Sequence, residues 1–198
     1  MLMGHITMDL VTLVLACSLY ADNSITYAMI QTDTQNNPLV VTVDDDTKVF
    51  KTIPAAVQYT QTQIALGKNL EIGLMQIPSR WLPKIGAHAS DLFRPCKNLV
   101  VATQILEKLR FKCQSIAVNN STSDLQSCVL SLYKNKNLQN GLPYARQIIE
   151  YAKTHPFNEL AEKARDPGML AAIEKPNTMP LHSKQALTEN SDSEDYSS

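Results

Sequence analysis

Residues 71–79 read EIGLMQIPS, and this is the most specific stretch of the chain. Its apolar side chains surround one carboxylate, one glycine and one glutamine. A short helix is expected around Leu74–Gln76. The stretch lies between two segments that the sequence predicts as longer helices.

The flanking segments show helical periodicity and helix-end signals. Pro54 suits the first turn of a helix that ends at Gly67, a natural C-cap. Further helices are predicted at 97–112 and 123–133, and a last helix is expected to follow Pro143. Towards the N-terminus, residues 8–33 predict two helices, the second beginning near Asn23 or Ser24, both good N-caps.

Residues 39–53 predict a β-hairpin. The arm 39–43 is rich in β-branched residues, and the acidic residues 44–46 form the turn. The turn lacks the glycine and distal glutamate of a calcium loop, so a solvated turn is expected. The fold class is therefore mainly α (α+β), with a small β-hairpin. The domain is expected to span residues 1–155, and the acidic, serine-rich end predicts a disordered tail over 156–198.

Composition excludes some classes of protein. The chain has 198 residues, of which 44% are hydrophobic and 19% charged, and its net charge is -1. It lacks the basic excess of a nucleic-acid-binding protein, and no run is long enough to span a bilayer, so at most peripheral membrane association is expected. The apolar run within residues 8–21 predicts a buried first helix; a signal anchor or cleaved signal is the alternative, although no Lys or Arg precedes Lys48.

The chain has four cysteines, Cys17, Cys96, Cys113 and Cys128. None forms a CxxC pair or lies near a histidine at zinc-binding spacing, so no metal site is expected. Two disulfides are possible, in three connectivities, and they would imply an oxidising compartment. Four buried free thiols are the alternative.

Several segments, in order and at matching spacing, resemble the lytic transglycosylase family. The resemblance is to its goose-type lysozyme-like domain, and specifically to the small transglycosylases attached to type IV secretion systems, over about residues 10–153. The family has a helix ending in Glu-Ser followed by Asn-Pro, then an acidic-x-Gly-Leu-Met-Gln segment, a Pro-Cys-x-Asn segment and an Ala-Tyr-Asn run. The matching residues are Asp33 to Leu39, Glu71 to Ile77, Leu92 to Leu99, and Leu132-Tyr133 with Asn137, Asn140-Gly141 and Tyr144.

The resemblance implies a cleft that cleaves the bond between N-acetylmuramic acid and N-acetylglucosamine to give 1,6-anhydro products. Most glycosidases need two carboxylates, but in this family the sugar's own C6 hydroxyl attacks, so one carboxyl acts first as acid and then as base. By alignment that carboxyl is Asp33, where the family has glutamate. Asp33 as a weakened acid, a site without activity, and a transfer of the role to the fallback acid Glu71 are the three possibilities.

The resemblance also implies other site residues and a disulfide pairing. Gln76 and Met75 would bind substrate, and a capping or core-edge amide is the alternative for Gln76. Tyr133 and Tyr144 would orient the acid or line the cleft, and core packing is the alternative for both. Lys134 and Lys136 stand where the family has Asn and Gly, and Trp81 suits either sugar stacking or a core position. Cys17 and Cys96 match the family's cysteines, which would leave Cys113 to pair with Cys128.

The resulting expectation is a peptidoglycan lytic transglycosylase that helps a type IV secretion or conjugation apparatus to assemble. A catalytically weak or inactive peptidoglycan-binding component of the same apparatus is the alternative. Glycan strands and secretion-channel subunits would be its partners, the periplasm or cell envelope of a bacterium its location, and no cofactor is expected.

Overall fold

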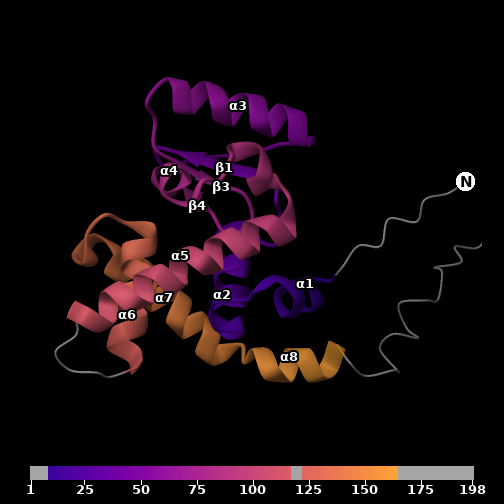
Figure 1. The fold of residues 1–198 in the computed structure, drawn as a ribbon. Coiled ribbons are helices and arrows are strands. Elements are labelled where there is room, and N and C mark those ends of the chain that lie inside the picture. Colours follow the sequence, from indigo (N-terminus) through magenta and orange to yellow (C-terminus); the bar gives the residue numbers. More distant parts are fainter. Residues whose placement is uncertain (1–8, 117–121, 165–198) are drawn as a thin grey trace, which may run out of the picture.

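The computed structural model describes residues 9–116 and 122–164. Along the described chain, helices α1 and α2 come first and helices α5 to α8 come last. A small sheet, helix α3 and shorter helices lie between them in sequence (Figure 1). The helices are α1 (Leu10–Cys17), α2 (Asn23–Thr34), α3 (Ile53–Ala65), α4 (Leu82–Ile85), α5 (Pro95–Ile116), α6 (Thr122–Lys134), α7 (Leu138–Thr154) and α8 (Phe157–Ala164). The strands are β1 (Val40–Val43), β2 (Asp46–Val49), β3 (Leu70–Ile72) and β4 (Ile77–Pro78), and two 3-10 turns are η1 (Ser79–Trp81) and η2 (Ala89–Phe93).

The sheet has four antiparallel strands in the order β2-β1-β3-β4. The predicted hairpin is confirmed as β1 and β2; its turn residues Asp44 and Asp45 have positive φ angles of 49° and 68°, as a tight hairpin turn requires. The sheet and α3 lie together at one end of the molecule, with α5 passing below them (Figure 1). The mainly α (α+β) class is therefore confirmed, with a larger sheet than the single predicted hairpin.

The short helix predicted around Leu74–Gln76 is wrong, because this segment is the turn between β3 and β4. Gly73 and Gln76 have φ angles of 72° and 45°, which a right-handed helix does not allow. A Cβ on Gly73 would lie 2.2 Å from the carbonyl oxygen of Leu92, so only glycine fits there. The turn instead ties the sheet to α5, because the buried Asn98 side chain accepts from Met75 N at 2.9 Å.

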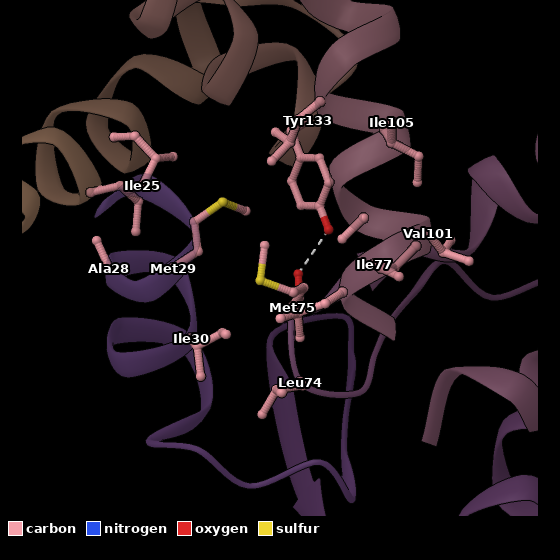
Figure 2. Close-up of a cluster of buried hydrophobic side chains, with 14 of the residues drawn as sticks. Ile25, Ala28, Met29, Ile30, Leu74, Met75, Ile77, Val101, Ile105 and Tyr133 are labelled. Atoms are coloured by element: carbon pink, nitrogen blue, oxygen red, sulfur yellow. Dashed lines mark hydrogen bonds between the residues drawn. The ribbon is translucent and has the colours of Figure 1, made fainter. Parts of the chain in front are cut away.

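The core lies where α2, α5 and α6 meet the β3–β4 turn. Figure 2 shows Met29 and Ile30 of α2 facing Met75, while Tyr133 of α6 approaches the same turn from another direction. The Tyr133 hydroxyl donates to the Met75 carbonyl oxygen at 2.8 Å. These side chains are fully buried, so the β3–β4 turn, which lies within the EIGLMQIPS stretch, is packed from several sides.

Two disulfides connect the helices. Cys17 at the end of α1 pairs with Cys96 at the start of α5, and Cys113 of α5 pairs with Cys128 of α6, with Cα–Cα distances of 5.3 and 6.0 Å. The pairing implied by the family resemblance is therefore confirmed. Helix α1 is the buried first helix expected for its apolar run, with Leu10, Leu13, Val14 and Cys17 all buried.

Two predicted boundaries differ from the structure. Helix α7 begins at Leu138 and contains Pro143, instead of starting after it, because Asn137 caps the helix through a hydrogen bond from Asn140 N at 2.9 Å. Helix α8 lies beyond residue 155, and its Phe157 is 2% exposed within the core. The packed part of the chain thus extends past the predicted boundary; residues 165–198 of the predicted tail lie outside the described residues.

Candidate active site

Asp33 lies in the last turn of α2. Asp22 caps the start of this helix by accepting hydrogen bonds from Ser24 N and Ile25 N, and Gln35 ends it in the left-handed conformation at a φ angle of 49°. The next residue, Thr34, is buried and donates to the Leu74 carbonyl oxygen at 3.0 Å. The helix end is thus bonded to the β3–β4 turn, which fixes the position of the carboxyl one residue earlier.

Tyr144 of α7 donates its hydroxyl to Asp33 Oδ2 at 2.9 Å, across 111 residues of sequence. The close packing of α6 and α7 makes this contact possible. Gly141 lies one helical turn before Tyr144, and a Cβ there would lie 2.3 Å from the Ser131 carbonyl oxygen of α6. Glycine at this position therefore brings the two helices together and directs Tyr144 towards the end of α2.

Glu71 and Lys134 form an ion pair beside this cluster. Residues alternate along β3, so Leu70 and Ile72 are buried while Glu71 faces outward, on the same side as its register partner Thr42 of β1. Lys134 ends α6, and its Nζ lies 5.1 Å from the centroid of the Tyr144 ring. The charged pair therefore packs directly against the tyrosine that holds Asp33.

Burial raises the pKa of Asp33 from 3.8 to about 6. The positive charge of Lys134 and the hydrogen bond from Tyr144 lower it, and the negative charge of Glu71 raises it further. Burial also raises the pKa of Tyr144 well above 10, so this hydroxyl stays protonated and remains a donor. A carboxyl poised near neutral pH beside a fixed donor is the arrangement expected of a general acid.

A cleft of about 380 Å³ lies beside the ion pair, between the sheet and the α6–α7 loop. Thr42, Glu71 and Arg80 line one wall, and Lys134 and Asn137 line the other. Asp33 is not among the lining residues. Glu71 and Lys134 couple Asp33 to the cleft electrostatically, because both line the cleft and their charges shift the pKa of Asp33.

The structure assembles only some of the predicted site residues beside the cleft, and of these only Glu71 lines it. Asp33, Glu71 and Tyr144 are brought together, whereas Met75 and Tyr133 are fully buried and have no surface for a ligand. Gln76 is 3% exposed, and its amide is used inside the fold: Nε2 donates to the Gly73 carbonyl oxygen and Oε1 accepts from Thr42 Oγ1. In the structure Met75, Gln76 and Tyr133 are therefore packed inside the fold, as in the core alternative given for Tyr133, and their contact with substrate stays a prediction.

Sequence reasoning missed Arg80 as a site residue. Its guanidinium donates to the carbonyl oxygens of Leu132, Tyr133 and Lys134 at the end of α6, which holds Lys134 at the cleft wall. The three free carbonyls at a helix C-terminus attract a cation, but the partner lies 52 to 54 residues away in the sequence. No local pattern identifies such a contact.

Across residues 9–116 and 122–164, no helix is both long and apolar enough to cross a membrane. Within the same ranges, no group of three or more His, Cys, Asp or Glu side chains is placed to hold a metal ion.

The fold and the cluster around Asp33 define a small helical domain with a partly buried carboxyl beside a polar cleft. The chain is similar to the type IV secretion system protein virB1 of Brucella abortus biovar 1, Brucella melitensis biotype 1 and Brucella suis biovar 1. Each is 32% identical over 82 residues, which cover 40% of this chain and 34% of the relative. The chain thus spans about a third of the length of these relatives. No family model matches the chain, and no solved structure does.

Proposed function

We propose that this protein is a lytic transglycosylase that opens peptidoglycan for a type IV secretion or conjugation apparatus. Asp33 is its general acid and base. The observation that carries the proposal is the buried Asp33 carboxyl, with a pKa of about 6 and a hydrogen bond from Tyr144. The similarity to virB1 proteins supports the link to type IV secretion.

The reaction needs one carboxyl. Protonated Asp33 gives its proton to the glycosidic oxygen as the bond from that oxygen to C1 of the muramoyl sugar breaks. The C6 hydroxyl of the same sugar then bonds to C1, and its proton goes to the Asp33 carboxylate. The products are a 1,6-anhydromuramoyl end and a free C4 hydroxyl on the leaving sugar, and the carboxyl is regenerated without water.

Glu71 is the weaker candidate for the acid. It is ion-paired with Lys134, and this pair requires the ionised carboxylate, which has no proton to donate. Asp33 is the carboxyl whose pKa burial raises. Glu71 instead sets the local field, because its negative charge raises the pKa of Asp33.

The two disulfides support a location in the periplasm or cell envelope. Disulfides persist in oxidising compartments and are rare in the cytosol, and both bridges join core helices of this domain. Peptidoglycan strands and secretion-channel subunits are the proposed partners.

A glycan-binding protein without catalytic activity is the second candidate. Two observations favour it: Asp33 does not line the cleft, and the Glu71–Lys134 pair lines it instead. Aspartate is also shorter than glutamate by roughly 1.5 Å, the length of one carbon–carbon bond. A misplacement of about 1 Å at a reacting group can cost roughly 100-fold in rate.

The test is muropeptide analysis of purified sacculi treated with wild type, Asp33→Asn and Asp33→Glu. Release of 1,6-anhydro muropeptides by the wild type and its loss in Asp33→Asn support the enzyme. If the wild type releases none and Asp33→Glu does, the wild-type protein is a binding component with an intact cleft. Equal release by wild type and Asp33→Asn means that Asp33 is not the acid.

A second pair of variants tests the role of the ion pair. Lys134→Asn removes the cation that lies between Tyr144 and Glu71, and Lys136→Asn removes a neighbouring exposed cation from the same cleft. If the ion pair restricts access to Asp33, only Lys134→Asn increases the release of anhydro products. Equal effects of both variants assign the change to the net charge of the cleft.

A further inference from the structure

A second pocket, of about 310 Å³, lies next to the cleft behind Arg80. It is bounded by η1 and α4, by the C-terminal half of α5, by the end of α6 and by the α6–α7 loop. It shares Arg80, Asn135 and Lys136 with the cleft, so the two spaces are adjacent and have a common wall. The pocket therefore lies close to any polymer bound in the cleft.

The pocket is strongly cationic. Arg80, Lys84, Lys112 and Lys136 line it, and none of its described lining residues is acidic. No described carboxylate lies within 4.0 Å of the charged nitrogens of these residues, whereas the cleft carries Glu71 and two aspartates. Because the whole chain has a net charge of -1, this positive excess is a local property of the pocket.

Trp81 lies in the wall of the pocket, and two cations lie over its ring. The Nζ atom of Lys84 is 4.9 Å from the ring centroid, and the Cζ atom of Arg80 is 6.0 Å from it. The indole holds the Lys84 ammonium at the pocket through a cation–π contact, and an ammonium group attracts carboxylates. Arg80 is already bonded to three carbonyl oxygens of α6, so Lys84, Lys112 and Lys136 are the cations of the pocket that fit a sugar unit carrying a carboxylate.

We propose that this pocket is a subsite for the carboxylate-bearing part of the glycan, with Lys84 and Lys112 as specificity-determining residues. The inference rests on the proposed function, because it takes the cleft to hold a glycan strand. The carboxylate comes from one of two sources on the muramoyl sugar: the lactyl group of a peptide-free strand, or the stem peptide attached to that group.

Trp81 makes the pocket directly observable, because it is the one tryptophan in the 198-residue sequence. Its fluorescence emission is measured while wild-type protein is titrated with three probes: chitohexaose, which has no carboxylate, solubilised peptide-free glycan strands, and peptide-bearing strands. We expect both carboxylated probes to shift the Trp81 emission and to bind about tenfold more tightly than chitohexaose at low salt, because several exposed ion pairs each add a few-fold. The difference should shrink as salt is raised.

The matched variants are Lys84→Gln with Lys112→Gln, and, as a control for the loss of two positive charges, Lys97→Gln with Lys163→Gln at exposed positions outside the pocket. The first double variant should bind chitohexaose normally and lose the preference for carboxylated strands; the control should keep it. The tighter of the two carboxylated probes identifies the source of the carboxylate.

Two results separate failure of this inference from failure of the proposed function. If all three probes bind equally, or the pocket variant keeps its preference, the subsite is wrong and glycan binding by the cleft stands. If no probe binds, chitohexaose included, the proposed function fails and the subsite fails with it.

Discussion

Asp33→Asn should stabilise the protein at neutral pH, and the gain should depend on pH. The raised pKa of Asp33 means that the folded protein binds a proton at this carboxyl more tightly than the unfolded chain does. Below pH 3.8 the carboxyl is protonated in both states, so its contribution to stability is fully present. As the pH rises through about 6, the folded protein must ionise a buried carboxyl and the contribution is lost.

The magnitude follows from the two pKa values. A change from 3.8 to about 6 corresponds to ~3 kcal/mol, at about 1.4 kcal/mol for each pH unit. This is an upper value, because the side chain keeps some contact with solvent and screening reduces it. Asparagine has the same shape, stays neutral and can still accept the hydrogen bond from Tyr144, so the variant should lack this pH dependence.

The measurement is urea unfolding of wild type and Asp33→Asn between pH 3.5 and pH 7.5. The difference in the free energy of unfolding should be near zero at the acid end and rise to at most ~3 kcal/mol in favour of the variant above pH 6.5. Asp45→Asn, at an exposed turn position, controls for the loss of one carboxylate from the chain. A difference for Asp33→Asn that is flat across this range would refute the claim that burial raises the pKa of Asp33.

Three further predictions test the support of the site. Tyr144→Phe removes a hydrogen bond to the Asp33 carboxylate and should raise the pKa of Asp33, by roughly 1 pH unit or more since hydrogen bonds to charged groups contribute about 1.5–3 kcal/mol; carboxyl carbon NMR titration measures it, and an unchanged midpoint contradicts it. Gly141→Ala places a Cβ against the backbone of α6 and should cost roughly 1–3 kcal/mol in urea unfolding, and a neutral effect would mean that α6 and α7 are not closely packed. Cys17→Ala with Cys96→Ser removes a bridge that joins residues 79 apart and should cost about 4 kcal/mol; a loss below about 1 kcal/mol would contradict this entropy-based reasoning.

Most of the longer helices and the β1–β2 hairpin could be predicted because their signals are local, whereas Asp33 was assigned through the family resemblance. Apolar periodicity and the N-terminal cap near Asn23 indicate α2, and the acidic turn after β-branched residues indicates the hairpin. The disulfide pairing came from the family resemblance alone, since four cysteines leave three connectivities open.

The errors arise where distant contacts override local preference. Leu74–Gln76 has the composition of a short helix, but the pairing of β3 with β4 and the bond from Met75 N to Asn98 make it a turn. Glu71 and Lys134 are 63 residues apart, and neither the ion pair nor its position beside Asp33 has a sequence signal. The motif predicted that Gln76 binds substrate, but in the structure its side-chain amide forms hydrogen bonds with Thr42 and with the Gly73 carbonyl oxygen.

Two features oppose catalysis by this site, and their magnitudes differ. The Glu71–Lys134 pair has side chains that are 22% and 24% exposed, and pairs near the surface are worth about 0.2–1 kcal/mol, so displacing Lys134 should change the rate by less than about tenfold. The shorter side chain of Asp33 should lower the rate by roughly 100-fold, because a misplacement of about 1 Å at a reacting group has a cost of that order. Asp33→Glu should therefore increase the release of anhydro products more than Lys134→Asn does. The reverse order would mean that access to the carboxyl limits the reaction, and that Asp33 already reaches the bond when Lys134 moves away.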